Sequence, residues 1–61
     1  MKYSELKKML KKAGCYKIRE GSNHELWYSQ ITDSQFAVGR NDSEDVKSGT
    51  CKAILKQAGL K

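Results

Sequence analysis

The feature that most constrains this chain is a change of hydrophobic periodicity, from helical to alternating and back to helical, within 61 residues. Apolar side chains near the N-terminus recur three and four positions apart, the spacing that places them on one side of a helix. These residues are Leu6, Met9, Leu10 and Ala13. The same spacing recurs near the C-terminus in Cys51, Ile54, Leu55 and Ala58. The pattern predicts one amphipathic helix at each end of the chain.

Hydroxyl and glycine residues mark the expected limits of these two helices. Ser4 and Thr50 are the expected N-caps, because a side-chain oxygen there can accept a hydrogen bond from the first free N–H groups. Gly14 and Gly59 are the expected ends, since glycine readily adopts the left-handed conformation that follows many helices. Lysines stand off both apolar stripes, so each helix is expected to have a basic outer side. They are Lys7, Lys8, Lys11 and Lys12, then Lys52 and Lys56.

Between the helices the side chains alternate with a period of two, which predicts strands. The expected strands cover residues 16–20, 24–29 and 35–38, and turns at 21–23 and near 32–34 join them. Two hairpins in series give an antiparallel meander, and two helices on one face would complete its core. The predicted fold class is α+β, a two-layer α-β-β-β-α single domain over residues 1–61, with an exposed connection from 39 to 49.

Composition limits the kind of site that such a chain can build. A domain of this size has a small core, so chemistry is expected at the surface or in a shallow groove. The net charge of +5 favours phosphate-bearing or other anionic partners. Cys15 and Cys51 are expected to be small buried hydrophobes, without a disulfide. The chain shows no secretory segment and no run long enough to span a membrane, and a cytoplasmic protein is expected.

His24 is the only histidine and the first candidate for proton transfer, because imidazole ordinarily titrates near neutrality. It opens a strand directly after Gly21, Ser22 and Asn23, where backbone N–H groups can bind a phosphate oxygen. The alternative is that a lone histidine at a strand edge is ordinary surface. One histidine with scattered carboxylates does not form a ligand set, so neither a metal nor another cofactor is expected.

Several cations are candidates for contact with an RNA backbone, which is recognised through phosphates and 2′-hydroxyl groups. They are Lys7, Lys8, Lys11, Arg19, Arg40, Lys47 and Lys52. Of Trp27 and Tyr28, which lie on opposite sides of the second strand, one is expected in the core. The other is free to stack on a base, and the sequence leaves open which. The acidic run 42–45 is interpreted as a solvated turn.

Taken together, these segments resemble the HicA toxins, small ribonucleases of bacterial toxin–antitoxin pairs. The matching residues are the N-terminal Leu6-Lys7-Lys8-Met9-Leu10 with Ala13-Gly14, the turn Gly21-Ser22-Asn23-His24 with Leu26-Trp27-Tyr28, and the C-terminal Gly49-Thr50 with Ile54-Leu55-Lys56-Gln57-Ala58-Gly59-Leu60. The resemblance implies a fold similar to a double-stranded-RNA-binding domain. It also implies cleavage of messenger RNA without a metal, an essential His24 held by the preceding turn, and a HicB antitoxin that covers the site, through which oligomers can form.

The chain departs from the family pattern after the third expected strand. Many HicA toxins have Val-Pro-Arg-His there, whereas this chain has Val38, Gly39, Arg40 and Asn41. Glycine is expected to loosen a rigid bend, and asparagine removes a second imidazole. The expected enzyme is therefore slow. Two other functions stay open: a module that binds RNA without cutting it, and an inactivated toxin that only binds its antitoxin.

Overall fold

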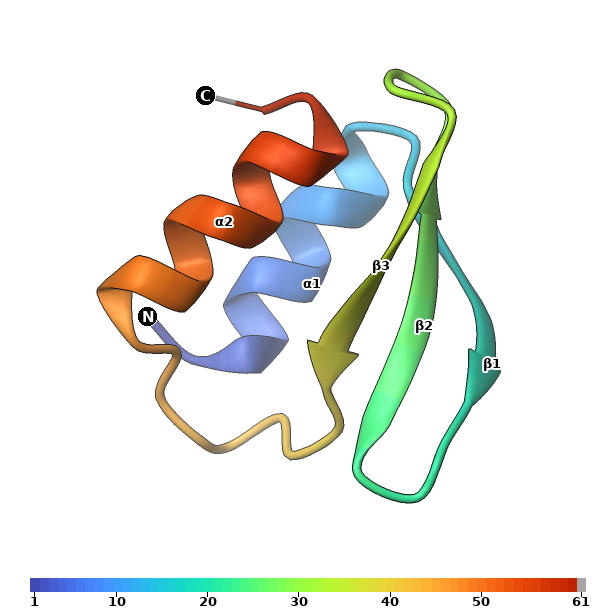
Figure 1. The fold of residues 1–61 in the computed structure, drawn as a ribbon. Coiled ribbons are helices and arrows are strands. Elements are labelled where there is room, and N and C mark those ends of the chain that lie inside the picture. The colour runs from blue at the N-terminus through green and yellow to red at the C-terminus, as the bar shows by residue number, and fades with distance from the viewer. Residues whose placement is uncertain (61) are drawn as a thin grey trace.

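The computed structural model describes residues 1–60, and Lys61, the last residue of the expected domain, lies outside the described residues. Two helices and three strands follow one another in the predicted order, with both helices side by side on one face of the sheet (Figure 1). The elements are α1 (Tyr3–Lys12), β1 (Tyr16–Glu20), β2 (His24–Ser29), β3 (Ser34–Gly39) and α2 (Ser48–Ala58). The predicted α-β-β-β-α architecture is confirmed.

The sheet is an antiparallel meander with the strands in the order β1-β2-β3. Strand β2 therefore pairs on both sides, with Trp27 opposite Lys17 of β1 and Phe36 of β3. A bulge between Lys17 and Arg19 interrupts the β1–β2 register. Along β2, alternate residues are buried, and these are Glu25, Trp27 and Ser29. One face of the sheet thus packs under the helices, while the other stays open.

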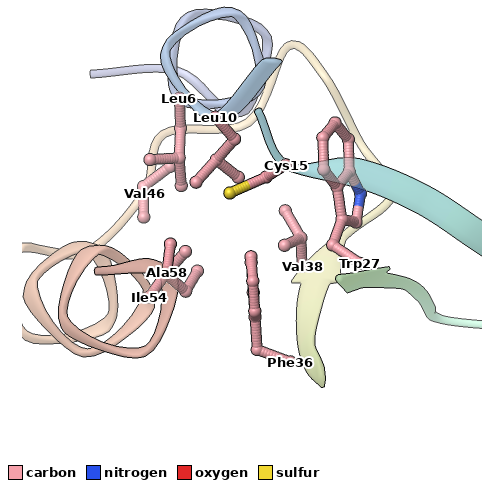
Figure 2. Packing of buried hydrophobic residues seen from close by; sticks show 9 residues of the cluster. All are labelled: Leu6, Leu10, Cys15, Trp27, Phe36, Val38, Val46, Ile54 and Ala58. Carbon is pink, nitrogen blue, oxygen red and sulfur yellow. The ribbon is translucent and has the colours of Figure 1, made fainter. Parts of the chain in front are cut away.

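The core lies between the helices and the sheet and draws on all layers (Figure 2). Trp27 is 1% exposed, which places it in the core and leaves Tyr28 on the open face beside Tyr16. Both cysteines are free, and Cys15 is buried as expected, whereas Cys51 is only half-buried. The buried apolar residues are Leu6, Leu10, Cys15, Trp27, Phe36, Val38, Val46, Ile54 and Ala58.

The buried side of α1 differs from the predicted stripe. Met9 is 40% exposed, whereas Lys7 is only 8% exposed, so the prediction of a solvent-facing Lys7 is wrong. The buried residues of α1 are Leu6, Lys7 and Leu10, which lie on one side of the helix. A lysine can occupy such a position because carboxylates from β2 and from the connection after β3 pair with its ammonium.

Both helices begin earlier than the sequence predicted. The N-cap of α1 is Lys2, and neither Ser4 nor Thr50 is a cap. Carbonyl groups from a distant segment replace the side-chain cap, because the Tyr3 N–H donates to the Glu44 carbonyl and the Ser4 N–H to that of Asp42. Helix α2 starts at Ser48, after Lys47 in an extended conformation. The predicted ends are confirmed, since Gly14 and Gly59 have φ of +95° and +87°.

The connection from β3 to α2 is fixed to the N-terminus and is not the simple exposed loop that was predicted. Val46 is buried, and its N–H donates to the Met1 carbonyl at 2.8 Å. Lys2 and Asp45 form an isolated β-bridge. These contacts bring the start of α1 beside residues 42–46. Neither helix described in residues 1–60 is long and apolar enough to cross a membrane.

Candidate active site

A polar groove of about 480 Å³ lies where the β1–β2 turn, the end of β3 and the start of α1 meet. Its lining comes from three regions that are far apart in the sequence. It consists of Tyr3, Ser22, Asn23, His24, Gly39, Arg40, Asn41 and Glu44. The structure thus brings the predicted His24, Ser22, Asn23 and Arg40 together at one open site.

His24 is exposed at the first position of β2, opposite Gly39 of β3. The turn before it is closed by a hydrogen bond of 2.7 Å from the Gly21 N–H to the His24 carbonyl. A Cβ at residue 21 would lie 3.0 Å from that carbonyl oxygen, so glycine permits the close approach. Gly21 therefore shapes the turn, while His24, Ser22 and Asn23 face the groove.

Arg40 joins the turn to the end of β3. Its Nη1 donates to the Ser22 carbonyl at 2.8 Å, and its Nη2 lies 3.5 Å from a Glu20 carboxylate oxygen. The side chain is still 45% exposed, so its guanidinium is open to an anionic ligand. The pKa of Glu20 is lowered, first by its hydrogen bond with Lys17 and then by the charges of Lys17 and Arg40. A cation therefore stands in the groove together with the imidazole.

Gly39 has a packing role that the sequence did not show. A Cβ at this position would lie 2.8 Å from Cζ of Tyr3, so the tyrosine ring rests on the bare backbone of β3. We expected this glycine to loosen the bend, but it instead admits an aromatic wall to the groove. Tyr3 and Glu44 were missed as lining residues. The contact that unites them, from the Tyr3 N–H to the Glu44 carbonyl, joins segments too distant for any local pattern to reveal.

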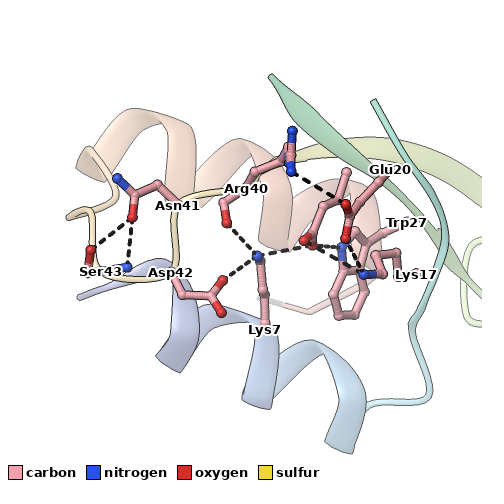
Figure 3. Close-up of polar contacts among 9 residues, drawn as sticks. Lys7, Lys17, Glu20, Trp27, Arg40, Asn41, Asp42 and Ser43 are labelled. Atoms are coloured by element: carbon pink, nitrogen blue, oxygen red, sulfur yellow. Dashed lines mark hydrogen bonds and ion pairs between the residues drawn. The ribbon is translucent and has the colours of Figure 1, made fainter. Parts of the chain in front are cut away.

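Asn41 stands where the family pattern has a histidine, and it too lines the groove. Its side-chain oxygen accepts hydrogen bonds from the Ser43 N–H at 3.2 Å and from the Ser43 hydroxyl at 2.8 Å (Figure 3). These bonds fix the turn at residues 41–43 and consume the oxygen, which leaves the amide N–H₂ as a donor. Asn41 can therefore bind an anion, but it cannot accept a proton as an imidazole does.

The predicted cationic residues do not all gather at the groove. Lys8, Lys11, Lys47 and Lys52 are exposed on or beside the helices but do not line it. Lys52 instead borders an apolar hollow with Leu55 and Leu60 near the end of α2. Within residues 1–60, no cluster of three or more histidine, cysteine or acidic side chains has the arrangement of a metal site.

The fold and the groove define a class of protein, a small basic α-β-β-β-α domain with a histidine and an arginine at an open polar site. The sequence model of the HicA toxin of bacterial toxin–antitoxin systems matches residues 3–60, and the chain belongs to this family. Searches among curated proteins and among solved structures gave no significant match. The family resemblance is therefore confirmed over nearly the whole chain.

Proposed function

We propose that this protein is an endoribonuclease that cleaves messenger RNA, with His24 as its proton-transfer residue. The observation that carries the proposal is the placement of an exposed imidazole in one groove with the Arg40 guanidinium, in a chain of the HicA toxin family. An open groove suits a polymer substrate, which needs access along its length and not an enclosing pocket. Membership of the family supports the enzyme class.

The proposed reaction uses the 2′-hydroxyl of the substrate as the nucleophile. His24 removes the proton of that hydroxyl, and the 2′-oxygen attacks the adjacent phosphorus. The bond from phosphorus to the 5′-oxygen breaks, and that oxygen takes a proton from solvent or from the imidazolium. The products are a 2′,3′-cyclic phosphate and a 5′-hydroxyl. No metal is needed for this sequence of steps.

Arg40 and the turn before His24 are proposed to bind the phosphate. The guanidinium and backbone N–H groups can hydrogen-bond to the oxygens on which negative charge grows in the transition state. Asn41 offers a further neutral donor. The exposed Lys8, Lys11, Lys47 and Lys52 would add attraction for the RNA backbone at a distance from the cleaved bond.

Family membership also guides the proposal for partners. A HicA toxin implies an antitoxin, and we propose that this antitoxin is a HicB-type protein that covers the His24 groove. The complex would form in the bacterial cytoplasm, and oligomers can form through the antitoxin. The element order agrees with a fold similar to a double-stranded-RNA-binding domain, which would favour folded or duplex segments of the RNA.

The decisive experiment compares His24→Ala with the unaltered protein. Removing the imidazole is expected to lower the rate of RNA cleavage by about 10²- to 10⁴-fold, the usual contribution of acid–base catalysis. Growth arrest in bacteria that express the protein should disappear in parallel. Gln57→Ala, a change at an exposed residue of α2, serves as the matched control. Equal cleavage by His24→Ala and by the unaltered protein would exclude His24 as the catalyst.

A second candidate function is binding of RNA or of the antitoxin without cleavage. Asn41 favours it, because this groove holds one imidazole where the family pattern provides two. The same experiment separates the two functions. Intact RNA after long incubation with the unaltered protein, together with unchanged RNA affinity in His24→Ala, would support the binding module.

A further inference from the structure

The ammonium of Lys7 is buried against the segment that carries Arg40 of the groove. Its side chain is 10% exposed, although lysine ordinarily keeps its charged end in water. The Nζ atom lies 3.0 Å from the Glu25 carboxylate, pairs with the Asp42 carboxylate, and donates to the Arg40 carbonyl at 3.5 Å (Figure 3). A buried charge with three acceptors from two other segments is a structural junction.

The partners of Lys7 come from the two segments that carry His24 and Arg40. Glu25 directly follows His24 in β2, whereas Arg40 and Asp42 flank Asn41 in the segment after β3. Their neighbours His24 and Asn41, together with Arg40 itself, line the groove. One ammonium thus ties the strand that carries the imidazole to the segment that carries the cationic and amide donors.

The contacts of Glu25 restrict its position further. Its Oε1 also accepts a hydrogen bond of 3.0 Å from Nε1 of the buried Trp27, and its Oε2 lies 3.9 Å from Nζ of Lys17. Its side chain is only 10% exposed. The carboxylate next to His24 is therefore fixed to the core on one side and to α1 on the other.

The charge state of the junction is maintained at neutral pH. Burial acts to lower the pKa of Lys7, but its hydrogen bonds with Asp42 and Glu25 outweigh this effect, and the pKa is raised. The pKa of Asp42 is lowered, chiefly by its hydrogen bond with Lys7. Both groups stay charged, so the tether persists whenever the protein is folded near neutrality.

Building on the proposed ribonuclease function, we propose that Lys7 is a positioning residue, whose pairing with Glu25 and Asp42 sets the placement of His24 relative to Arg40 and Asn41. Lys7 itself does not touch the substrate. A buried ion pair contributes little net stability compared with apolar residues of the same volume. The ion pair instead fixes the relative positions of groove residues. Proton transfer and phosphate binding require groups from two separate segments to converge on one phosphodiester.

The test uses Asp42→Asn, because Lys7→Met would leave Glu25 buried without its partner and can prevent folding. The side chain of Asp42 is 64% exposed, so its replacement leaves the core intact. Asp45→Asn is the matched control, since it makes the same charge change in the same connection. Its side chain is 80% exposed and its nearest cation is Lys2, at 4.0 Å.

The first measurement is steady-state cleavage of a labelled mixed-sequence oligoribonucleotide. We expect Asp42→Asn to lower kcat by about tenfold or more, with KM within about twofold, because misplacement of catalytic groups impairs the chemical step. Asp45→Asn should leave both constants near those of the unaltered protein. Equal kcat values for the two variants would overturn the positioning role of the Lys7 junction.

The second measurement is the NMR signal of the His24 imidazole, which is unambiguous in a chain with one histidine. Asp42→Asn is expected to shift or broaden this signal, and Asp45→Asn to leave it in place. Identical spectra for both variants would overturn the inference. The NMR measurement needs no catalysis. If the unaltered protein fails to cut RNA, the proposed function is refuted, but the NMR comparison still tests the positioning role of Lys7.

Discussion

Different kinds of contact stabilise the two ends of the molecule. At one end, the groove end, charged side chains of Lys7, Glu25, Asp42 and Arg40 join the β1–β2 turn, the segment after β3 and α1. At the other, the closed end, the last turn of α2 packs on the β2–β3 turn. There the buried Ser29 hydroxyl donates to the Ala58 carbonyl at 2.6 Å, and Thr32 donates to the Gln57 carbonyl at 2.7 Å.

This difference separates the end that holds the proposed RNA-binding groove from the end that stabilises the fold. Neutral hydroxyl-to-carbonyl bonds and close apolar packing at the closed end do not depend on pH or ionic strength. Ion pairs at the groove end do, because a titration or a screening ion weakens them. The groove end presents the charged groups that the proposed reaction would use, while hydroxyl-to-carbonyl bonds between α2 and the β2–β3 turn stabilise the fold at the closed end.

The largest effect on stability is expected from Gly59→Ala at the closed end. This residue has φ of +87°, and a Cβ there would lie 2.5 Å from Cγ2 of Ile31. Backbone strain and steric overlap together should cost about 2–4 kcal/mol, a large share of the stability of so small a domain. Thermal and urea unfolding monitored by circular dichroism would measure the loss.

Gly14→Ala is the matched control for this change. Its φ is +95°, but no atom lies within 4 Å of the added Cβ, so only the backbone strain applies. We expect a loss of about 1–2 kcal/mol. If the two variants lose equal stability, the contact between Gly59 and Ile31 does not hold the closed end.

A smaller loss is expected from Ser29→Ala, which removes the buried hydroxyl at the closed end. Ser29 is fully buried, and its hydroxyl also accepts hydrogen bonds from the Ile31 and Thr32 N–H groups. The change leaves these groups without their partner and should cost about 1–3 kcal/mol. This cost should stay nearly constant from pH 7 down to about pH 4, because no charge is involved. Denaturant unfolding at several pH values measures it, and a loss that varied strongly with pH would contradict a neutral contact between Ser29 and the end of α2.

The smallest effect, and the one that changes with pH, is expected at the groove end. The pKa of Asp42 is lowered below its ordinary 3.8 in the folded protein, first by its hydrogen bond with Lys7. Its stabilising contribution is therefore present above about pH 4 and is lost as the pH falls through the lowered pKa. Asp42→Asn should be slightly less stable than the unaltered protein at pH 7 and equal to it in strong acid. A difference independent of pH would show that the carboxylate charge is not responsible.

The order of the elements followed from the sequence because it depends on local periodicity. The alternation around Leu26 and the helical stripe around Ile54 each repeat within a few residues, and both glycine ends depend only on backbone conformation. The predicted N-cap of α1 was wrong because the first N–H groups of this helix find their acceptors in carbonyls from the other half of the chain. The burial of Lys7 was missed for the same reason, since only the paired Glu25 and Asp42 explain it.

The candidate site was predicted in part. His24 and its turn are contiguous in the sequence, and the resemblance to HicA toxins marked them. Tyr3 and Glu44 carry no such signal, because they reach the groove only when α1 and the segment after β3 meet. The consequence of Gly39 was misjudged, since a missing side chain can mean either a flexible bend or space for a neighbouring ring.

The attachment of the N-terminus to residues 42–46 bears on how the protein is made. The first N–H groups of α1 obtain their acceptors from Asp42 and Glu44, and the Met1 carbonyl accepts from Val46. A ribosome-bound nascent chain that has released only its first 40 residues therefore lacks this tertiary cap, together with Asn41 and Glu44 of the groove lining. The start of α1 and the full lining of the groove therefore form only after residues 41–46 have left the ribosome.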